Sequence, residues 1–169
     1  MNGGQSNSLA TFTIIFLSHG DHYLLLERSP DKQFAPGRWT GVGGLVEPSE
    51  YNNLQGSALR ELKEETGITE RSVDQFALKR LLLHARPEGP LTVLLYFTGS
   101  LKERVTPHCP EGILRWVKPE QFSELDVIET TRPVLPLLIN DQKHNGDQPP
   151  AMGIASYRRD GTFDRITWA

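Results

Sequence analysis

Residues 60–68 read Arg-Glu-Leu-Lys-Glu-Glu-Thr-Gly-Ile, and this is the most informative stretch of the chain. In a helix, residues three and four apart share a face, so Glu61, Glu64 and Glu65 would place three carboxylates on one side. Like charges at this spacing destabilise a helix by roughly 0.2–0.5 kcal/mol per pair. A hard divalent cation such as Mg²⁺ relieves the repulsion because it binds carboxylate oxygens. The stretch therefore predicts a helix that carries a metal site.

The size and composition of the chain indicate one soluble domain. It has 169 residues, enough for a sizeable core, with 37% hydrophobic and 23% charged residues. The net charge of −3 provides no basic field for a nucleic-acid polymer, so we expect none as a partner. We expect residues 1–8 to form a flexible N-terminus and residues 9–169 to form a single domain.

Cysteine content and the N-terminal sequence favour a cytoplasmic protein. Cys109 is the only cysteine, so no intramolecular disulfide is possible, which fits a reducing compartment. Residues 1–10 are polar and lack the basic segment of a signal peptide. The longest apolar stretch, Phe12–Leu17, is too short to cross a bilayer, so we expect no membrane association.

The pattern along the chain predicts a long helix among strands. Asn52 or Asn53 can cap a helix that runs to Thr66, and Gly67 suits the left-handed position after its end. Strands are expected at 10–17, 22–27, 72–86, 91–101 and 113–117, and a C-terminal hairpin at 153–159 and 162–168. We expect a partly extended segment at 39–46 and further helices at 119–125 and 131–140. Loops are expected at 87–90 and 141–150. These elements predict an α/β or α+β sandwich.

The stretch also completes a longer motif. Gly44 to Glu50, followed by Arg60 to Ile68, resembles the Nudix box, whose pattern is G-x5-E-x7-R-E-U-x-E-E-x-G-U with U aliphatic. Nine specified positions agree. Glu50 and Arg60 are separated by nine residues where the pattern has seven. We expect the two extra residues to lengthen the loop before or near Gly56, which puts the placement of Glu50 against Arg60 in question.

The resemblance implies a Nudix-type α/β/α sandwich with a mixed sheet and one catalytic helix. It also implies hydrolysis of a nucleoside diphosphate linked to another group, with Mg²⁺ or Mn²⁺ as cofactor. By this resemblance the main metal ligands are the carboxylates of Glu61 and Glu65, and the backbone carbonyl of Gly43 is a further ligand. Glu64 is another ligand or the partner of the catalytic base. Arg60 orients the glutamates and pairs with Glu50. Gly44, Glu50 and Gly67 are the structural positions of the box.

Two residues outside the box resemble functional positions in other Nudix enzymes. Glu111 stands just before a predicted strand, where a glutamate completes the metal site or acts as base in several subfamilies; the alternative is an ordinary loop glutamate. Arg28 ends a predicted strand, where similar enzymes place a phosphate-binding arginine; the alternative is a surface arginine beside Glu27. Arg38 has a weaker claim of the same kind.

Residues 37–44 resemble hydrolases of oxidised purine nucleoside triphosphates, but the base-reading positions differ. Where that group has an asparagine after the tryptophan, Thr40 follows Trp39, and where it has two aspartates this chain has Thr130 and Thr131, next to Glu129. A site loses discrimination when its hydrogen-bonding partners change. The candidate substrate-binding residues are therefore Arg28, Arg38, Trp39, Thr40, Glu129 and Thr130. Trp39 and Trp116 are candidates for stacking on a base, although a core position is the commoner role.

The sequence thus predicts a Mg²⁺-dependent pyrophosphohydrolase that converts a nucleoside triphosphate, ordinary or modified such as 8-oxo-dGTP, to its monophosphate and pyrophosphate. The expected partner is a small-molecule nucleotide, and the protein is expected to be a monomer or homodimer. The alternatives are hydrolysis of a nucleotide sugar, ADP-ribose or a dinucleoside polyphosphate, and a non-catalytic nucleotide-binding Nudix module.

Overall fold

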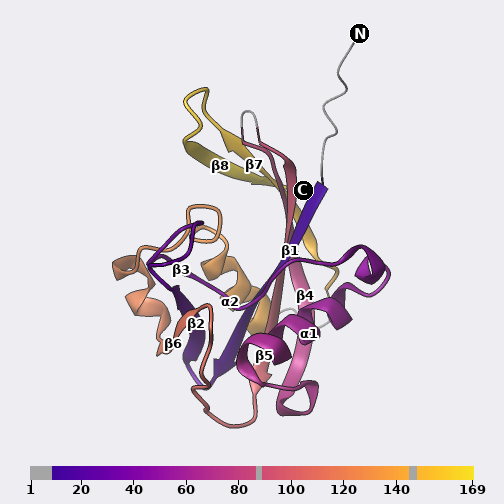
Figure 1. The fold of residues 1–169 in the computed structure, drawn as a ribbon, viewed down its shortest axis with the longest axis vertical. Helices are drawn as coiled ribbons and strands as arrows, with labels where there is room; N and C mark the ends of the chain where they lie inside the picture. Colours follow the sequence, from indigo (N-terminus) through magenta and orange to yellow (C-terminus); the bar gives the residue numbers. More distant parts are fainter. Residues whose placement is uncertain (1–8, 87–88, 145–147) are drawn as a thin grey trace.

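A mixed β-sheet with a helix on each face forms the described part of the molecule (Figure 1). The structure, a computed structural model, describes residues 9–86, 89–144 and 148–169. The expected flexible N-terminus at 1–8 lies outside these residues, as do two positions of the expected 87–90 loop and three of the 141–150 loop. None of the helices in the described ranges combines the length and hydrophobicity needed to cross a membrane.

Eight strands of the described residues pair in one sheet, in the order β3-β2-β1-β5-β4-β7-β8, with β6 also paired to β2. The β1–β5 and β4–β7 pairs are parallel and the other pairs are antiparallel. The strands are β1 (Leu9–His19), β2 (His22–Arg28), β3 (Trp39–Thr40), β4 (Val73–His84), β5 (Leu91–Leu101), β6 (Gly112–Val117), β7 (Ala151–Tyr157) and β8 (Phe163–Trp168). The mixed α+β class predicted from the sequence is confirmed.

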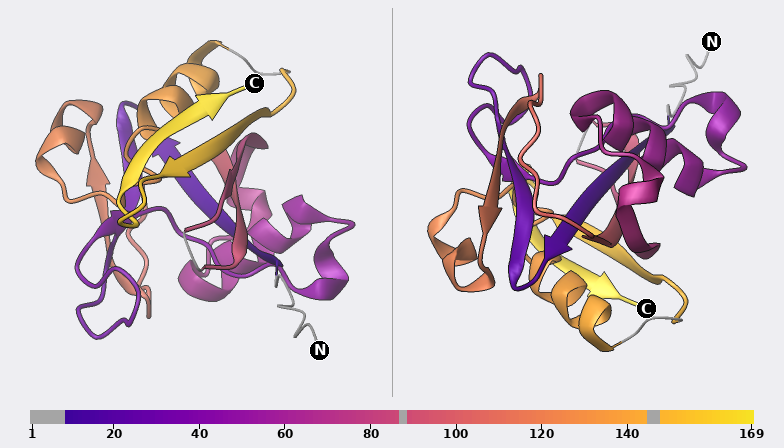
Figure 2. Two further views of the ribbon diagram at one scale, coloured as in Figure 1. Left: turned by 90° about the horizontal axis from the view of Figure 1, so that it is seen from above. Right: turned by 90° about the horizontal axis from the view of Figure 1, so that it is seen from below.

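Alternating side chains of the central strands build two cores, one on each face. In β1, Ile15 and Leu17 pack toward helix α1 (Leu54–Thr66), while Phe16 packs toward helix α2 (Leu135–His144). The same alternation divides the buried residues of β5. The two helices therefore cover opposite faces of the sheet, as the views from above and from below show (Figure 2).

Helix α1 has its own start and stop signals. The Oδ1 atom of Asn53 accepts the backbone N–H of Gly56 at 3.0 Å, and a Cβ atom on Gly56 would overlap the Asn53 side chain. Gly56, a residue type that is unfavourable in a helix interior, therefore makes room for the cap. Gly67 ends the helix with φ 73°. The predicted bounds of this helix are confirmed to within one residue.

The two extra residues of the box are accommodated ahead of that cap. Residues Pro48–Glu50 form a 3₁₀ turn, in which the Glu50 carboxylate accepts the N–H of Glu47 at 3.0 Å. Tyr51 follows in a turn, and its hydroxyl donates to the Thr11 hydroxyl on β1 at 3.0 Å. The longer connection is thus tied to both the box and the sheet, and α1 begins after it with its own cap at Asn53.

The predicted bounds of the second helix were wrong. The helix was expected at 131–140 and a loop at 141–150, but residues 131–134 are a turn and α2 continues to His144. Pro136 falls in the first turn, where a missing N–H is tolerated. At the other end, the buried Asp141 carboxylate accepts two hydrogen bonds from Arg80 on β4, at 2.7 and 2.8 Å. This ion pair extends the helix over polar residues.

The other predicted helices and strands are present with small shifts in their bounds. The 119–125 segment is a 3₁₀ helix, Pro119–Glu124, and the C-terminal hairpin turns at Gly161 with φ 82°. Its first strand, β7, is fastened to β4 through a hydrogen bond of 3.0 Å between the Tyr157 hydroxyl and Nδ1 of His84.

We expect the burial of His84 to make stability depend on pH. Burial lowers the pKa of His84 below its ordinary 6.5, and Arg86 lowers it further. The unfolded chain therefore binds a proton that the folded chain does not, and stability falls as pH drops through 6.5 toward the folded pKa. Urea unfolding at pH 7.5 and 5.5 should show a smaller loss for His84→Gln than for the unaltered protein. Equal losses would contradict this prediction.

Candidate active site

Glu61 and Glu65 of α1 lie against the glycine-rich segment that crosses to β1. The backbone N–H of Gly43 donates to Oε2 of Glu65 at 3.2 Å. A Cβ atom on Gly44 would overlap the Glu61 carboxylate. Only a backbone without side chains fits here, so the glycine pair lets main-chain atoms and two carboxylates meet.

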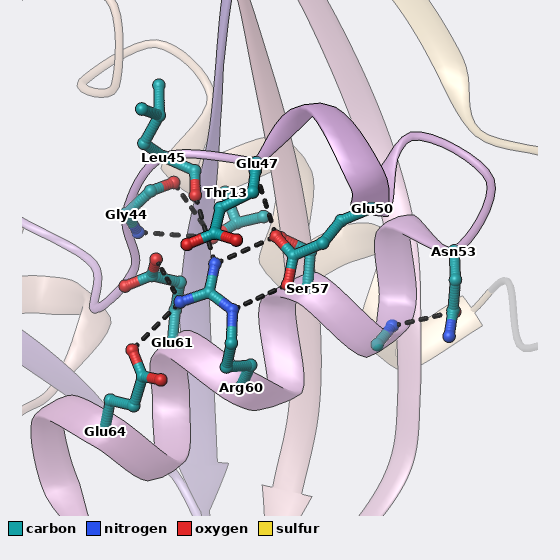
Figure 3. A network of polar contacts seen from close by, with 11 residues as sticks. Thr13, Gly44, Leu45, Glu47, Glu50, Asn53, Ser57, Arg60, Glu61 and Glu64 are labelled. Atoms are coloured by element: carbon teal, nitrogen blue, oxygen red, sulfur yellow. Dashed lines mark hydrogen bonds and ion pairs between the residues drawn. The ribbon is translucent and has the colours of Figure 1, made fainter.

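Arg60 organises the carboxylates around it (Figure 3). Its Nε and Nη2 atoms donate to the two oxygens of Glu50 at 2.6 and 2.9 Å, which is a bidentate pair. Its Nη1 atom donates to Glu61 at 2.8 Å and to Glu64 at 2.9 Å, and Nη2 also reaches the Leu45 carbonyl at 3.2 Å. The predicted Glu50–Arg60 contact is thus present in spite of the longer connection.

Glu50 is held as a carboxylate. Hydrogen bonds from Arg60, the Glu47 N–H and the Ser57 hydroxyl lower its pKa to about 2. With both oxygens occupied, Glu50 holds the Arg60 guanidinium, and the guanidinium in turn holds Glu61 and Glu64.

The three glutamates of the helix differ in environment. The side chain of Glu64 is 60% exposed, whereas that of Glu61 is 13% exposed. Burial raises the pKa of Glu65 to about 7; the Gly43 N–H opposes this, while the charges of Glu111 and Glu61 add to it. A cation beside Glu65 would favour its charged form. Glu61 and Glu65 therefore face inward as a pair, and Glu64 faces solvent.

Glu111 and Arg28 join this cluster from the sheet. Glu111 directly precedes β6 and Arg28 ends β2, and both act electrostatically on Glu65. The Arg28 Nε atom donates to the Phe34 carbonyl at 3.0 Å. Lys32, which the sequence did not single out, donates to Oε1 of Glu111 at 2.6 Å. Lys32 lies in a Pro- and Gly-containing loop with no periodicity, so no sequence signal could have found it.

The donor set suits a hard divalent cation. Carboxylate and carbonyl oxygens are the ligands that Mg²⁺ and Mn²⁺ prefer. The acidic side chains of the cluster outnumber the basic ones. The acidic residues are Glu50, Glu61, Glu64, Glu65 and Glu111, and the basic residues are Arg28, Lys32 and Arg60. Within 9–86, 89–144 and 148–169, no three Asp, Glu, His or Cys side chains converge as a ready-made cage. Arg60 and Lys32 pair with these carboxylates instead, so metal binding requires rearrangement of side chains.

Other candidate substrate residues form a second cluster beyond β3. Arg38 donates to the Glu129 carboxylate and to the Val127 carbonyl, the latter at 2.9 Å. Arg86 donates to the other Glu129 oxygen at 2.6 Å. Trp39 is bonded through its backbone to residues 126 and 128 and packs against the core on the α2 side. Arg38 and Glu129 thus bind each other rather than the glutamates of α1.

The threonines at the base-reading positions are buried. Thr40 is 6% exposed, Thr130 5% and Thr131 1%, and the Tyr96 hydroxyl lies 3.4 Å from both the Thr130 carbonyl and the Thr131 hydroxyl. Trp116 lies elsewhere: its indole N–H donates to the Val105 carbonyl at 2.8 Å and Arg104 covers its ring. These contacts place Trp116 among the residues that follow β5.

We expect Gly43→Ala to damage both stability and activity. Gly43 has φ 146°, and a Cβ atom there would overlap the Thr13 carbonyl on β1. The backbone must shift away from Glu65, because both sides of Gly43 are occupied. Thermal unfolding together with the Mn²⁺ dissociation constant will measure this, with Gly161→Ala in the exposed hairpin as a strained but remote control. Metal affinity as good in Gly43→Ala as in the control would contradict the assignment.

Comparison with known proteins agrees with this geometry. The NUDIX domain family matches residues 7–138. The nucleoside triphosphatase NudI of Escherichia fergusonii is 28% identical over 123 residues, covering 68% of this chain and 86% of NudI.

Among solved structures, a mutator MutT protein from Bacillus halodurans has a TM-score of 0.65 at 24% identity, covering 94% of this chain and 97% of its own. The MutT protein from Methanosarcina mazei has a TM-score of 0.66 at 22% identity, covering 83% and 99%. These two show that the fold is shared. Nudix hydrolases generally use divalent metals. With a matching family over most of its length and a complete set of box glutamates, this chain belongs to the Nudix family and is a Nudix hydrolase.

Proposed function

We propose that the protein is a Mg²⁺- or Mn²⁺-dependent pyrophosphohydrolase that cleaves a nucleoside triphosphate to its monophosphate and pyrophosphate. The observation that carries the proposal is the Arg60-centred network, which gathers Glu50, Glu61 and Glu64 beside the Gly43–Gly44 backbone. The name of the NudI relative, a nucleoside triphosphatase, supports the substrate class.

The chain supplies binding groups for each part of the reaction. A polyphosphate is already anionic, so attack by water requires charge neutralisation and in-line positioning. Glu61, Glu65 and Glu111 would hold the divalent cation with the Gly43 carbonyl, and the bound cation neutralises phosphate charge and lowers the pKa of water. Arg28 binds phosphate oxygens from the sheet side, and a carboxylate of the glutamate cluster accepts the proton of the attacking water.

The residues at the base-reading positions favour broad recognition. Thr40, Thr130 and Thr131 are buried, and Glu129 is paired with two arginines. Neither arrangement offers the free carboxylate pair expected of an oxidised-guanine site. We therefore propose a general nucleoside triphosphatase, for which 8-oxo-dGTP is one of several substrates.

A substrate panel tests the proposal. The purified protein with Mg²⁺ is mixed with the eight ordinary nucleoside triphosphates, 8-oxo-dGTP, ADP-ribose, a nucleotide sugar and a dinucleoside polyphosphate. We expect monophosphate and pyrophosphate in equal amounts from triphosphates, and no turnover with excess chelator. Turnover restricted to ADP-ribose, the sugar nucleotide or the dinucleotide would overturn the proposed substrate class, and no turnover of any compound would favour a binding module.

A further inference from the structure

Two contacts join the loop after β2 to the residue before β6. The backbone N–H of Ser29 donates to the Glu111 carbonyl at 2.9 Å, and the Lys32 ammonium donates to the Glu111 carboxylate at 2.6 Å. Between them, the Lys32 N–H closes a turn onto the Ser29 carbonyl at 3.1 Å. These backbone contacts hold the loop so that the Lys32 side chain can reach the Glu111 carboxylate.

The Lys32–Glu111 pair is partly withdrawn from water. The side chains are 32% and 30% exposed. Removal of one partner from a partly buried ion pair has a cost, because the remaining charge is less well solvated than on an open surface. If Glu111 binds a divalent cation, Lys32 needs another anion. Its four-carbon stem lets the ammonium swing while the loop stays in place.

The anion that fits is the phosphate chain of the substrate. Arg28 is the last residue of β2, and Lys32 lies in the loop that follows it. Glu111, which accepts the hydrogen bond from Lys32, acts electrostatically on Glu65, and so does Arg28. Both basic groups thus border the carboxylate cluster, where a polyphosphate would be bound.

We propose that Lys32 is a phosphate-binding residue that serves as the counter-ion of Glu111 in the metal-free protein. A divalent cation and Lys32 compete for the Glu111 carboxylate, and the displaced ammonium binds the phosphate chain. This inference rests on the proposed function, since it requires a polyphosphate substrate.

The first test measures metal binding without nucleotide. Lys32→Met should bind Mn²⁺ about threefold to tenfold more tightly than the unaltered protein, as measured by electron paramagnetic resonance of free Mn²⁺. Lys118→Met, which also loses one positive charge but pairs with Asp21 at 3.0 Å, is the matched control and should not change affinity. In a Glu111→Gln background the effect of Lys32→Met should vanish. An unchanged or weaker affinity in Lys32→Met, or an effect that persists without Glu111, overturns the proposal.

The second test measures phosphate binding with inorganic tripolyphosphate. With saturating Mn²⁺, calorimetry should show about tenfold weaker binding for Lys32→Met and none of this loss for Lys118→Met. Equal binding in Lys32→Met and the unaltered protein overturns the proposal. Failure to turn over any nucleoside triphosphate would refute the proposed function while leaving both binding measurements readable, so the two failures are distinguishable.

Discussion

Glu65→Gln is expected to lower kcat by about 10²–10⁴-fold while the protein remains folded, because the amide cannot carry the charge that binds a cation or accepts a proton. The amide oxygen can still accept the Gly43 N–H, so the local fold should persist. Burial and the charges of Glu111 and Glu61 already raise the pKa of Glu65, so the unaltered carboxylate has the most to gain from a bound cation.

Steady-state kinetics with Mg²⁺ and thermal unfolding check this result together. Glu70→Gln makes the same chemical change in an exposed 3₁₀ turn just beyond α1, and it should leave kcat unchanged. Full turnover in Glu65→Gln would show that Glu65 is not a catalytic residue. The circular dichroism spectrum of the variant will show whether a loss of turnover comes from unfolding or from the changed side chain.

Arg60→Gln is expected to reduce kcat/KM by about 10–100-fold, the size of effect seen when a residue that orients metal ligands is removed. It abolishes the bidentate pair with Glu50 and releases Glu61 and Glu64 from their shared nitrogen. The carboxylates then repel one another without a common partner.

Arg60→Lys separates charge from geometry. A lysine restores one positive charge but cannot present a planar fork, so it should recover only part of the lost activity. Arg71→Gln, at an exposed position of the turn after α1, is the control. If Arg60→Gln equals the unaltered protein in kcat/KM and in Mn²⁺ affinity, the network is not a positioning device.

Local signals were sufficient to predict the helix and its carboxylates. Asn53 and Gly67 mark its ends by hydrogen bonding and backbone conformation, which act within a few residues. The resemblance to the Nudix box also implied that Arg60 pairs with Glu50, and this contact is present although the spacing between the two residues put it in question. Where a contact depends only on neighbours along the helix and on a family pattern, the sequence is informative.

Contacts between distant segments could not be predicted. Lys32 and Glu111 are 79 residues apart, and Arg38 and Glu129 are 91 apart, so their pairing depends on strand order. The same reason explains the misplaced end of α2, where Asp141 pairs with Arg80 of β4. The polar composition of residues 141–150 predicted a loop. The contact of Asp141 with Arg80 on β4 leaves no trace in the neighbouring sequence, so it could not correct that prediction.

The turn between Glu50 and Asn53 has a consequence for how this enzyme can diversify. The cap of α1 is made by Asn53 and does not use the residues of the turn, so we expect changes in loop length to leave the carboxylates of α1 in place. Insertions after Tyr51 would alter the surface beside β1, while Tyr51 and Glu50 keep their contacts with Thr11 and Arg60. Grafted peptides or new specificity loops should therefore be tolerated best between Tyr51 and Asn53.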